Sequence, residues 1–328
     1  MTWRKLRNGS CPATACQMGR PLRHVPYPYA PFEVTIRTIM GMRLLKPSPE
    51  VNEIIVGVFA RALALYKVRL HELIAFNTHL QYIVGVRDAE ALARFMAFVH
   101  GNLAKEMGRI FGWRGHLWSR RGRPIPIVDD EALEQRIRYI YKHGVKEGFV
   151  TSPLEWPGVA SVKARVSGEP LVGYWFNRTA ESQARRQGKH FGKYDFATRY
   201  ELELCPAPCW QHLSEEQYRA KVVSIVKDIE DEAAEAARDG DRFAGLETLA
   251  AQDPLEIRPT LKRSPAPLCH ASTKESRDQY RKDYYCFAEA FYAAADALVE
   301  GILDVVFPEG CFPRPRPFVM PIESLAPS

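Results

Sequence analysis

The sequence predicts an α+β protein, in which a four-stranded antiparallel sheet with two helices on one face precedes a mostly helical region. Three observations support this prediction. Short alternating, β-branched runs recur in the first 130 residues. Capped segments with helical periodicity separate them. Two long stretches of helical spacing follow beyond residue 165.

The spacing of apolar residues predicts the first strands and the first helix. The run "FEVTIRTIM" (32–40) alternates and predicts a strand, and "PSPEVNEIIVGVFARALALYK" (47–67) opens with Ser and Pro before apolar residues at helical spacing. Two further alternating runs, 68–76 and 78–86, meet at Asn77 and Thr78. A junction this short between two strands predicts a β-hairpin.

The remaining elements of this half follow in order. An Asp cap opens a helix at "DAEALARFMAFVHGNLAKEMGRIF" (88–111), and "RPIPIVDD" (123–130) reads as a short strand. Asp129 or Asp130 caps the next helix, "EALEQRIRYIYKH" (131–143), which we expect to end at Gly144. The order is that of a ferredoxin-like split βαββαβ sheet, whose second face is left for a ligand or another element.

Composition divides the chain into three predicted parts. Residues 1–30 form a basic arm, residues 31–165 hold the sheet domain, and residues 166–328 form a mainly helical region of unknown role. Within the last part we expect helices over 214–240 and 276–306, a Pro-rich connector over 254–272 and a Pro-rich tail.

The charge is unevenly distributed along the chain. Residues 1–160 hold 23 Lys and Arg against 13 Asp and Glu, a net of +10, whereas the remainder has a net of −4. A basic half suits a polyanion such as nucleic acid, although a solvated surface without a partner fits the same pattern. We find no secretory signal and no apolar run near the ~20 residues that span a bilayer. The expected location is therefore cytoplasmic, with no membrane partner.

Polar side chains interrupt one strand of the predicted hairpin. In "THLQYIV" the period of two places His79 and Gln81 on one face of the sheet, while Leu80, Tyr82 and Val84 face the two helices. Two adjacent donors on a rigid strand can share a metal ion. On the pattern alone, an ordinary polar sheet face is the commoner explanation.

The helix at 131–143 carries the second constellation. Tyr139 and His143 lie four residues apart on one face, and Gln135 lies one turn earlier. A divalent ion held by His79, Gln81 and His143 would polarise a phosphate, and Tyr139 would attack it to form a phosphotyrosine. Gln135 could help to orient that phosphate. The alternatives are a helix-capping role for His143 and a half-buried packing role for Tyr139.

Basic residues alternate with aromatic residues in "GWRGHLWSRRGRP" (112–124), a composition that suits single-stranded nucleic acid. A basic surface around a packed Trp is the alternative. Arg4, Lys5 and Arg7 of the N-terminal arm are candidates for a second contact. The residues that we expect to bind DNA are Arg20, Arg23, Arg37, Arg114, Trp118, Arg120, Arg121 and Arg123.

From Gly19 to about Val162 the chain resembles a known family. "GRPLRHVPYPYAPFEVTIR" is similar to an opening arm and first strand, and "AFNTHLQYIV" stands where the family has M-P-N-H-x-H and three apolar residues. "RGHLWSRR" resembles G-x-x-W-x-x-R, and "RYIYKHGVKEGFV" resembles R-Y-I-x-x-N-P-V-R-A-G-x-V. These segments, in this order, resemble the REP-associated tyrosine transposases of the single-tyrosine HUH superfamily.

The resemblance implies a function and a set of residues. Members cleave and rejoin single-stranded DNA next to hairpins, with one tyrosine and a divalent metal, here Mg²⁺ or Mn²⁺. The first motif histidine corresponds to His79, the nucleophile to Tyr139, and the amide ligand after it to His143. The second motif histidine corresponds to Gln81. The two departures are complementary, because the set still holds two imidazoles and one amide.

The sequence thus predicts a metal-dependent transposase that acts on single-stranded or hairpin DNA. One alternative is a domesticated protein that binds hairpin DNA without cutting it. A lower-ranked alternative is an RNA-binding module, which would place aromatic side chains on the open sheet face, where this chain has His79 and Gln81.

Overall fold

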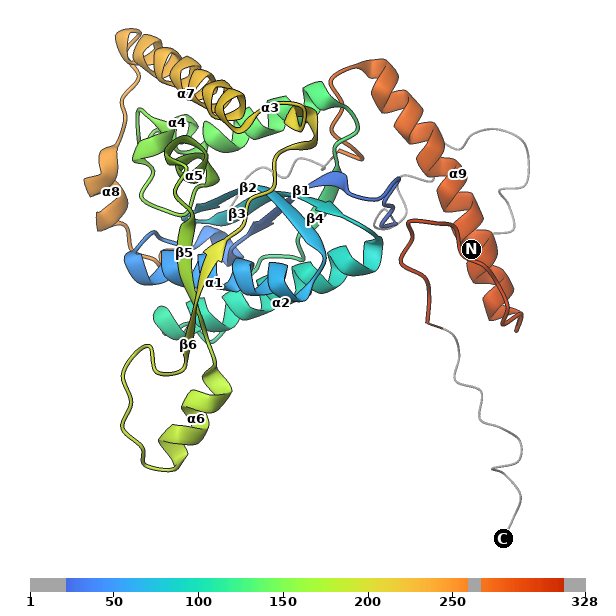
Figure 1. Ribbon diagram of the computed structural model, residues 1–328, viewed down its shortest axis with the longest axis horizontal. Helices are drawn as coiled ribbons and strands as arrows, with labels where there is room; N and C mark the ends of the chain where they lie inside the picture. The colour runs from blue at the N-terminus through green and yellow to red at the C-terminus, as the bar shows by residue number, and fades with distance from the viewer. Residues whose placement is uncertain (1–21, 259–266, 316–328) are drawn as a thin grey trace.

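A four-stranded antiparallel sheet forms the centre of the computed structural model, which describes residues 22–258 and 267–315 (Figure 1). The spatial order of the strands is β2-β3-β1-β4. The strands are β1 (Ala30–Arg37), β2 (Val68–Phe76), β3 (His79–Val86) and β4 (Arg123–Pro126). Helix α1 (Pro49–Leu65) follows β1, and α2 (Ala89–Ile110) follows β3. This arrangement confirms the predicted split βαββαβ fold.

Both crossover helices begin at the caps that the sequence indicates and pack on one face of the sheet. The Ser48 side chain accepts a hydrogen bond from the Val51 amide (3.2 Å), and Asp88 accepts one from Ala91 (2.7 Å). On this face Phe59 of α1 meets the Tyr82 ring edge-on, with the centroids 5.2 Å apart. The first core therefore lies between β3 and the two helices.

The second face of the sheet is covered as well. Helices α3 (Asp130–Tyr141), α4 (His143–Lys146), α5 (Ser161–Ser167) and α7 (Glu215–Arg238) contribute to this second layer. Its core joins sheet residues to α3 and α7 and includes Ile74, Ile83, Ile137, Ile140, Val222 and Ile229. We expected either a ligand or another element of the chain on this face, and the structure places helices of the chain there. The domain division at residue 165 stays a prediction, and this core draws residues from both sides of it.

The helix that carries Tyr139, α3, ends at Tyr141 and not at Gly144 as expected. After one residue outside the regular pattern, α4 continues past Gly144 to Lys146. A Cβ at Gly144 would lie 3.0 Å from Val150 Cγ2 and 3.2 Å from Trp156 Cε3. The glycine therefore allows close packing inside the helix, and Gly148, with a φ of +72°, follows where the chain turns away.

An arm that the sequence analysis did not predict projects from the body (Figure 1). It consists of the antiparallel pair β5 (Leu171–Phe176) and β6 (Ala197–Leu202), with α6 (Arg178–Arg186) between them. The base of the arm lies directly on α1, because a Cβ at Gly57 would lie 2.0 Å from the Tyr174 carbonyl oxygen. Only glycine permits this approach.

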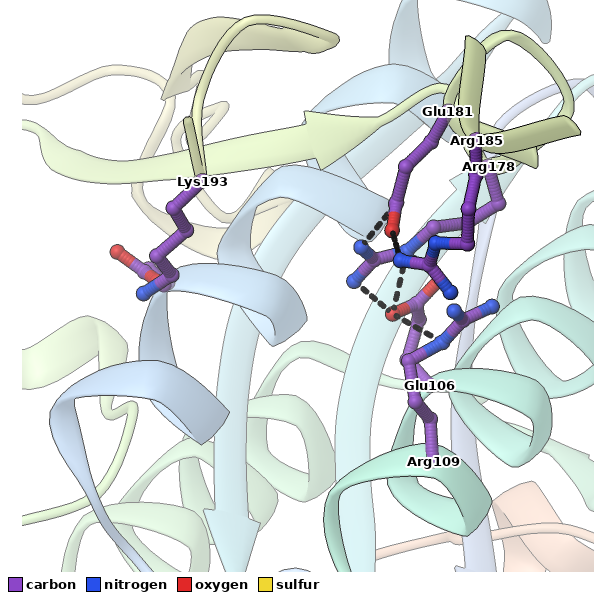
Figure 2. Close-up of polar contacts among 7 residues, drawn as sticks. Glu106, Arg109, Arg178, Glu181, Arg185 and Lys193 are labelled. Carbon is purple, nitrogen blue, oxygen red and sulfur yellow. Dashed lines mark hydrogen bonds and ion pairs between the residues drawn. The ribbon is translucent and has the colours of Figure 1, made fainter. Parts of the chain in front are cut away.

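Ion pairs fix the arm to the two crossover helices. Figure 2 shows Arg178 between Glu106 of α2 and Glu181 of α6. Two nitrogens of the Arg178 guanidinium bond the Glu106 carboxylate at 2.6 and 3.0 Å, and a third bonds Glu181 at 2.7 Å. On the other side of the arm, Lys193 bonds Glu53 of α1. Partly buried, fork-shaped Arg–carboxylate pairs of this kind hold elements in one orientation.

The remaining elements are two helices of the C-terminal part and three 3₁₀ turns along the chain. They are α8 (Gly245–Ala251), α9 (Lys274–Val299) and the 3₁₀ turns η3 (Ile39–Gly41), η4 (Pro153–Glu155) and η5 (Pro208–Trp210). The predicted helix over 276–306 is too long, because Gly301 adopts a φ of +94° directly after α9. Helix α9 runs beside the β4 edge of the sheet (Figure 1). None of the helices in the described ranges is long and apolar enough to cross a membrane.

Candidate functional site

Helices α3 and α4 follow one another almost without a break, and we call the pair the α3–α4 rod; one face of it carries three candidate site residues in a row. The Asp129 side chain caps α3 through the Ala132 amide (2.8 Å), and Lys142, in α-helical conformation, joins α3 to α4. Tyr139, His143 and Lys146 therefore follow one another at i, i+4 and i+7 along one side.

The two predicted histidine ligands meet between this rod and the sheet. The rings of His79 and His143 pack edge to face with their centroids 4.5 Å apart, and the Tyr139 ring lies 5.7 Å from that of His143. Phe76 packs against both histidines, at 5.3 and 4.9 Å. On the sheet, Arg37 of β1 lies directly opposite His79. The structure thus brings His79 into contact with His143, 64 positions later in the chain.

The His143 ring has no hydrogen-bond partner among the described residues. Both of its nitrogens are buried without a hydrogen bond, and the Glu147 carboxylate comes no closer than 4.0 Å. His79 Nδ1, by contrast, lies 3.1 Å from the Thr78 hydroxyl. Buried ring nitrogens without a partner are costly unless a ligand satisfies them.

Both imidazoles are held in the neutral form. Burial, followed by the nearby charges of Lys146 and Arg37, lowers the pKa of His143 to about 4. Burial and the neighbouring His143 lower the pKa of His79 well below its usual range. Neutral imidazole is the form that coordinates a metal ion, so both rings are ready to do so at neutral pH.

Gln81, the predicted amide ligand, is engaged by a carboxylate that the sequence analysis did not single out. Its amide nitrogen donates to Glu33 of β1, which also accepts from Arg136 (2.7 Å) and lies 2.7 Å from His270 Nε2. Burial alone would raise the pKa of Glu33, but His270 and Arg136 lower it to about 2. The alternation of "FEVTIR" already placed Glu33, like Gln81, opposite the apolar face, which is the signal that could have found it.

The hydroxyl of Tyr139 lies among positive charges. Lys146 Nζ donates to it at 3.0 Å, and the Arg136 guanidinium lies 4.2 Å from the ring centroid. The side chain is partly exposed, so the oxygen remains within reach of a substrate. Lys146 was not predicted as a site residue, although its spacing from Tyr139 and His143 on one helix face was readable in the sequence.

Gln135 lies one turn before Tyr139, as expected, but its side chain is exposed and donates to Glu131 Oε1 at 3.3 Å. No described contact joins it to Tyr139 or to either histidine. Its proposed part in orienting a phosphate stays a prediction.

The residues predicted to bind DNA fall into separate groups. Arg23, Arg120, Arg121 and Arg123 line a common hollow, while Arg37 lies beside His79. Arg114 is exposed in the turn after α2, away from this hollow's lining. Trp118 is half-buried, and its indole N–H donates to the His100 carbonyl (2.9 Å), so part of its ring packs on the core. Arg20, Arg4, Lys5 and Arg7 lie outside the described residues.

The expected divalent ion can be tested against these donors. Within the described ranges no cluster of three or more His, Cys, Asp or Glu side chains has the arrangement of a metal site. His79 and His143 nevertheless supply two neutral imidazoles at contact distance, one of them with both nitrogens unsatisfied. The amide of Gln81 lies two residues along β3 on the same face. Two imidazoles and an amide oxygen fit Mg²⁺ less closely than Mn²⁺, which accepts nitrogen more readily.

Comparisons with known proteins give faint likenesses. No family model and no curated protein matches the chain. A REP-associated tyrosine transposase bound to a REP hairpin is similar over 46% of this chain and 86% of its own, with 15% identity and a TM-score of 0.37. A putative transposase from Deinococcus radiodurans is similar over 38% of this chain and 95% of its own, with 18% identity and a TM-score of 0.28. Likenesses this faint establish neither the family nor the function of this chain.

Proposed function

We propose that this protein is a metal-dependent transesterase of the transposase type that cleaves and rejoins single-stranded DNA next to hairpins. One observation carries the proposal: Tyr139 stands one turn from the unsatisfied His143 ring, which packs on His79, while Lys146 contacts the tyrosine hydroxyl. A nucleophile, two metal-binding nitrogens and a cation thus share one small site.

In the proposed reaction the Tyr139 oxygen attacks a backbone phosphorus, forms an O–P bond and loses its proton to solvent. The bond from phosphorus to the 3′ oxygen breaks, and this oxygen takes up a proton to leave as a 3′-hydroxyl. Lys146 and Arg136 place positive charge where the attacking oxygen and the phosphate carry negative charge. His79, His143 and Gln81 would hold a divalent ion that polarises the phosphate.

A labelled single-stranded DNA hairpin incubated with the full chain and Mn²⁺ tests the proposal. The wild type should form a covalent protein–DNA adduct that withstands denaturant, and Tyr139→Phe should remove it. The matched control, Tyr194→Phe on the arm, alters another partly exposed tyrosine and should leave adduct formation unchanged. Adduct formation by Tyr139→Phe at the wild-type rate would refute the mechanism.

Metal binding is measured separately from activity. Mn²⁺ added to the apo-protein should give a bound electron paramagnetic resonance signal that His143→Ala and His79→Ala each weaken. An equal signal in both variants would exclude these side chains as ligands.

A domesticated protein that binds hairpins without cutting them is the second candidate. The bond from Gln81 to Glu33 favours it, because a glutamine committed to a carboxylate is less free to serve as a ligand. Tight hairpin binding by the wild type without any adduct would support this candidate. An RNA-binding sheet surface fits less well, because α3 and α7 cover the face that would stack bases.

A further inference from the structure

A basic hollow lies at the β4 edge of the sheet, away from Tyr139. It has a volume of about 480 Å³ and is lined by Arg23, Arg120, Arg121 and Arg123, together with aromatic residues of the C-terminal part. Its lining includes no Asp or Glu. We name it the arginine hollow. Ligand sites in proteins commonly have volumes of about 300–1,000 Å³, so a single nucleotide is within its capacity.

Segments far apart in the sequence hold the walls of the hollow in place. The Leu22 amide donates to the Tyr284 hydroxyl of α9 (2.7 Å), and the His24 ring stacks on Phe287 with the centroids 4.1 Å apart. The Val25 amide donates to the Gly310 carbonyl (2.9 Å), which fixes the segment before Phe312. The hollow is therefore preformed, and Tyr280 and Tyr284 of α9 form part of its wall.

Three arginines of the hollow, Arg23, Arg120 and Arg121, have no acidic partner among the residues that the structure describes. Arg120 and Arg121 are exposed, and no acidic side chain of the described ranges pairs with them. Arg23 is half-buried, with one long contact to the Ala89 carbonyl (3.4 Å), and burial lowers its pKa. A partly desolvated guanidinium without a carboxylate is stabilised by an anionic ligand, and arginine matches phosphate in particular.

Aromatic side chains stand beside these arginines. Tyr280 and Tyr284 of α9 form one side, and the Phe312 ring at the rim is 46% exposed. Phosphate-binding arginines next to an exposed ring are the combination that binds a single strand, in which the base stacks on the ring. The paired bases of a duplex cannot present a base to this ring, so an unpaired nucleotide suits the hollow better.

We propose that the arginine hollow binds one unpaired nucleotide of the DNA strand, which makes α9 part of the DNA-binding surface. The choice of DNA as the polymer rests on the proposed function. Phe32, at the start of β1, lines the hollow, and Arg37, at its end, lies opposite His79. The two lie five positions apart along the strand, or ~17 Å, so the bound nucleotide flanks the cleaved phosphate and is not the one attacked.

The test measures binding of a fluorescent oligothymidylate by the full chain with Tyr139→Phe, which cannot consume the DNA. Added Arg121→Glu and Phe312→Ala changes should each weaken binding about tenfold or more, and Phe312→Trp should restore it. The charge-matched control, Arg94→Glu on the exposed side of α2, should have little effect. Unchanged binding by both hollow variants would overturn the proposal.

Two further experiments identify the ligand. A 5-iodouracil oligonucleotide should crosslink to Phe312 or to residues of α9, and thymidine monophosphate should compete at lower concentration than inorganic phosphate. Equal competition by the two would show that the hollow binds only an anion, which would refute the proposed nucleotide site. Binding of RNA but not of DNA would refute the proposal as well. If the wild type forms no adduct while the hollow variants still weaken binding, the proposed chemistry fails and the hollow stands. If adducts form and the variants bind normally, only the hollow fails.

Discussion

The pair His79–His143 determines what the site can do at the level of single residues. Burial lowers the pKa of both imidazoles, and the nitrogens of His143 have no described partner. A histidine that served only to cap a helix would be expected to lie protonated near the helix carbonyls. Here the ring instead packs against Phe76 and His79 inside the layer between helix and sheet.

Lys146 provides a sharp test at this scale. Replacing it with Gln removes the charge 3.0 Å from the Tyr139 oxygen, so single-turnover adduct formation should slow roughly tenfold to a hundredfold. Hairpin affinity should change little, because one exposed cation among many is lost. Lys146→Arg should retain most of the rate. Lys227→Gln on the exposed side of α7 is the control, and an equal loss there would assign the effect to overall charge.

At the level of elements, the α3–α4 rod and the arm show how sequence-distant segments are fixed. The rod keeps Tyr139, His143 and Lys146 in one row because Gly144 lets Trp156 and Val150 pack tightly against its continuation. The arm is fixed by side-chain charges, chiefly the contact of Arg178 with Glu106 (Figure 2). The position of the arm should therefore depend on a few ion pairs.

Glu106→Gln tests this dependence. The change removes the partly buried charge that two Arg178 nitrogens bind. The free energy needed to open the arm locally should therefore fall by about 1–3 kcal/mol, while the global fold is retained. Hydrogen exchange over residues 171–202 should become faster, and trypsin should cleave near Arg185 and Arg186. Glu90→Gln on the same helix loses only the exposed pair with Arg94 and should leave the arm protected. Equal hydrogen-exchange rates of the arm in both variants would contradict a role of the Arg178–Glu106 pair in holding it.

At the level of the whole molecule, the sheet is buried on both faces, and this places four histidines in the interior. Burial lowers the pKa of His71, His100 and His143 to about 4 and that of His79 well below its usual range. In the unfolded chain these groups have pKa values near 6.5. Between pH 6.5 and about 4 the unfolded state therefore binds more protons than the folded state.

The free energy of unfolding should consequently fall as the pH falls through this window. Above pH 6.5 the stability contributed by these neutral histidines is fully present. Glu33 acts at lower pH, because its pKa is lowered from 4.5 to about 2, so its contribution is lost only below pH 4.5. Urea unfolding between pH 7 and 4.5 measures the effect, and His100→Gln should flatten the slope. A constant stability from pH 7 to 5 would refute it.

The strands and the first helices could be predicted closely because their signals are local. Predicted and observed bounds agree for β2, β3 and α2, where alternation or an Asp88 cap marks the ends. The arm was missed because β6 is mixed in polarity and pairs with β5 across a long connection. Of the site, Tyr139, His79, Gln81 and His143 were named from the sequence, whereas Lys146 and Glu33 were recognised from their contacts in the structure.

The sequence by itself determined the order of strands and helices along the chain, the sheet face shared by His79 and Gln81, and the common helix face of Tyr139 and His143, because strand and helix periods act over a few residues. Only the tertiary structure decided that the two histidines touch and that the Gln81 amide donates a hydrogen bond to Glu33. It also decided that Leu22, Arg121 and Tyr284 line one hollow. Such contacts join segments up to 262 positions apart. They depend on how apolar faces pack in space, and no local pattern in the chain encodes that.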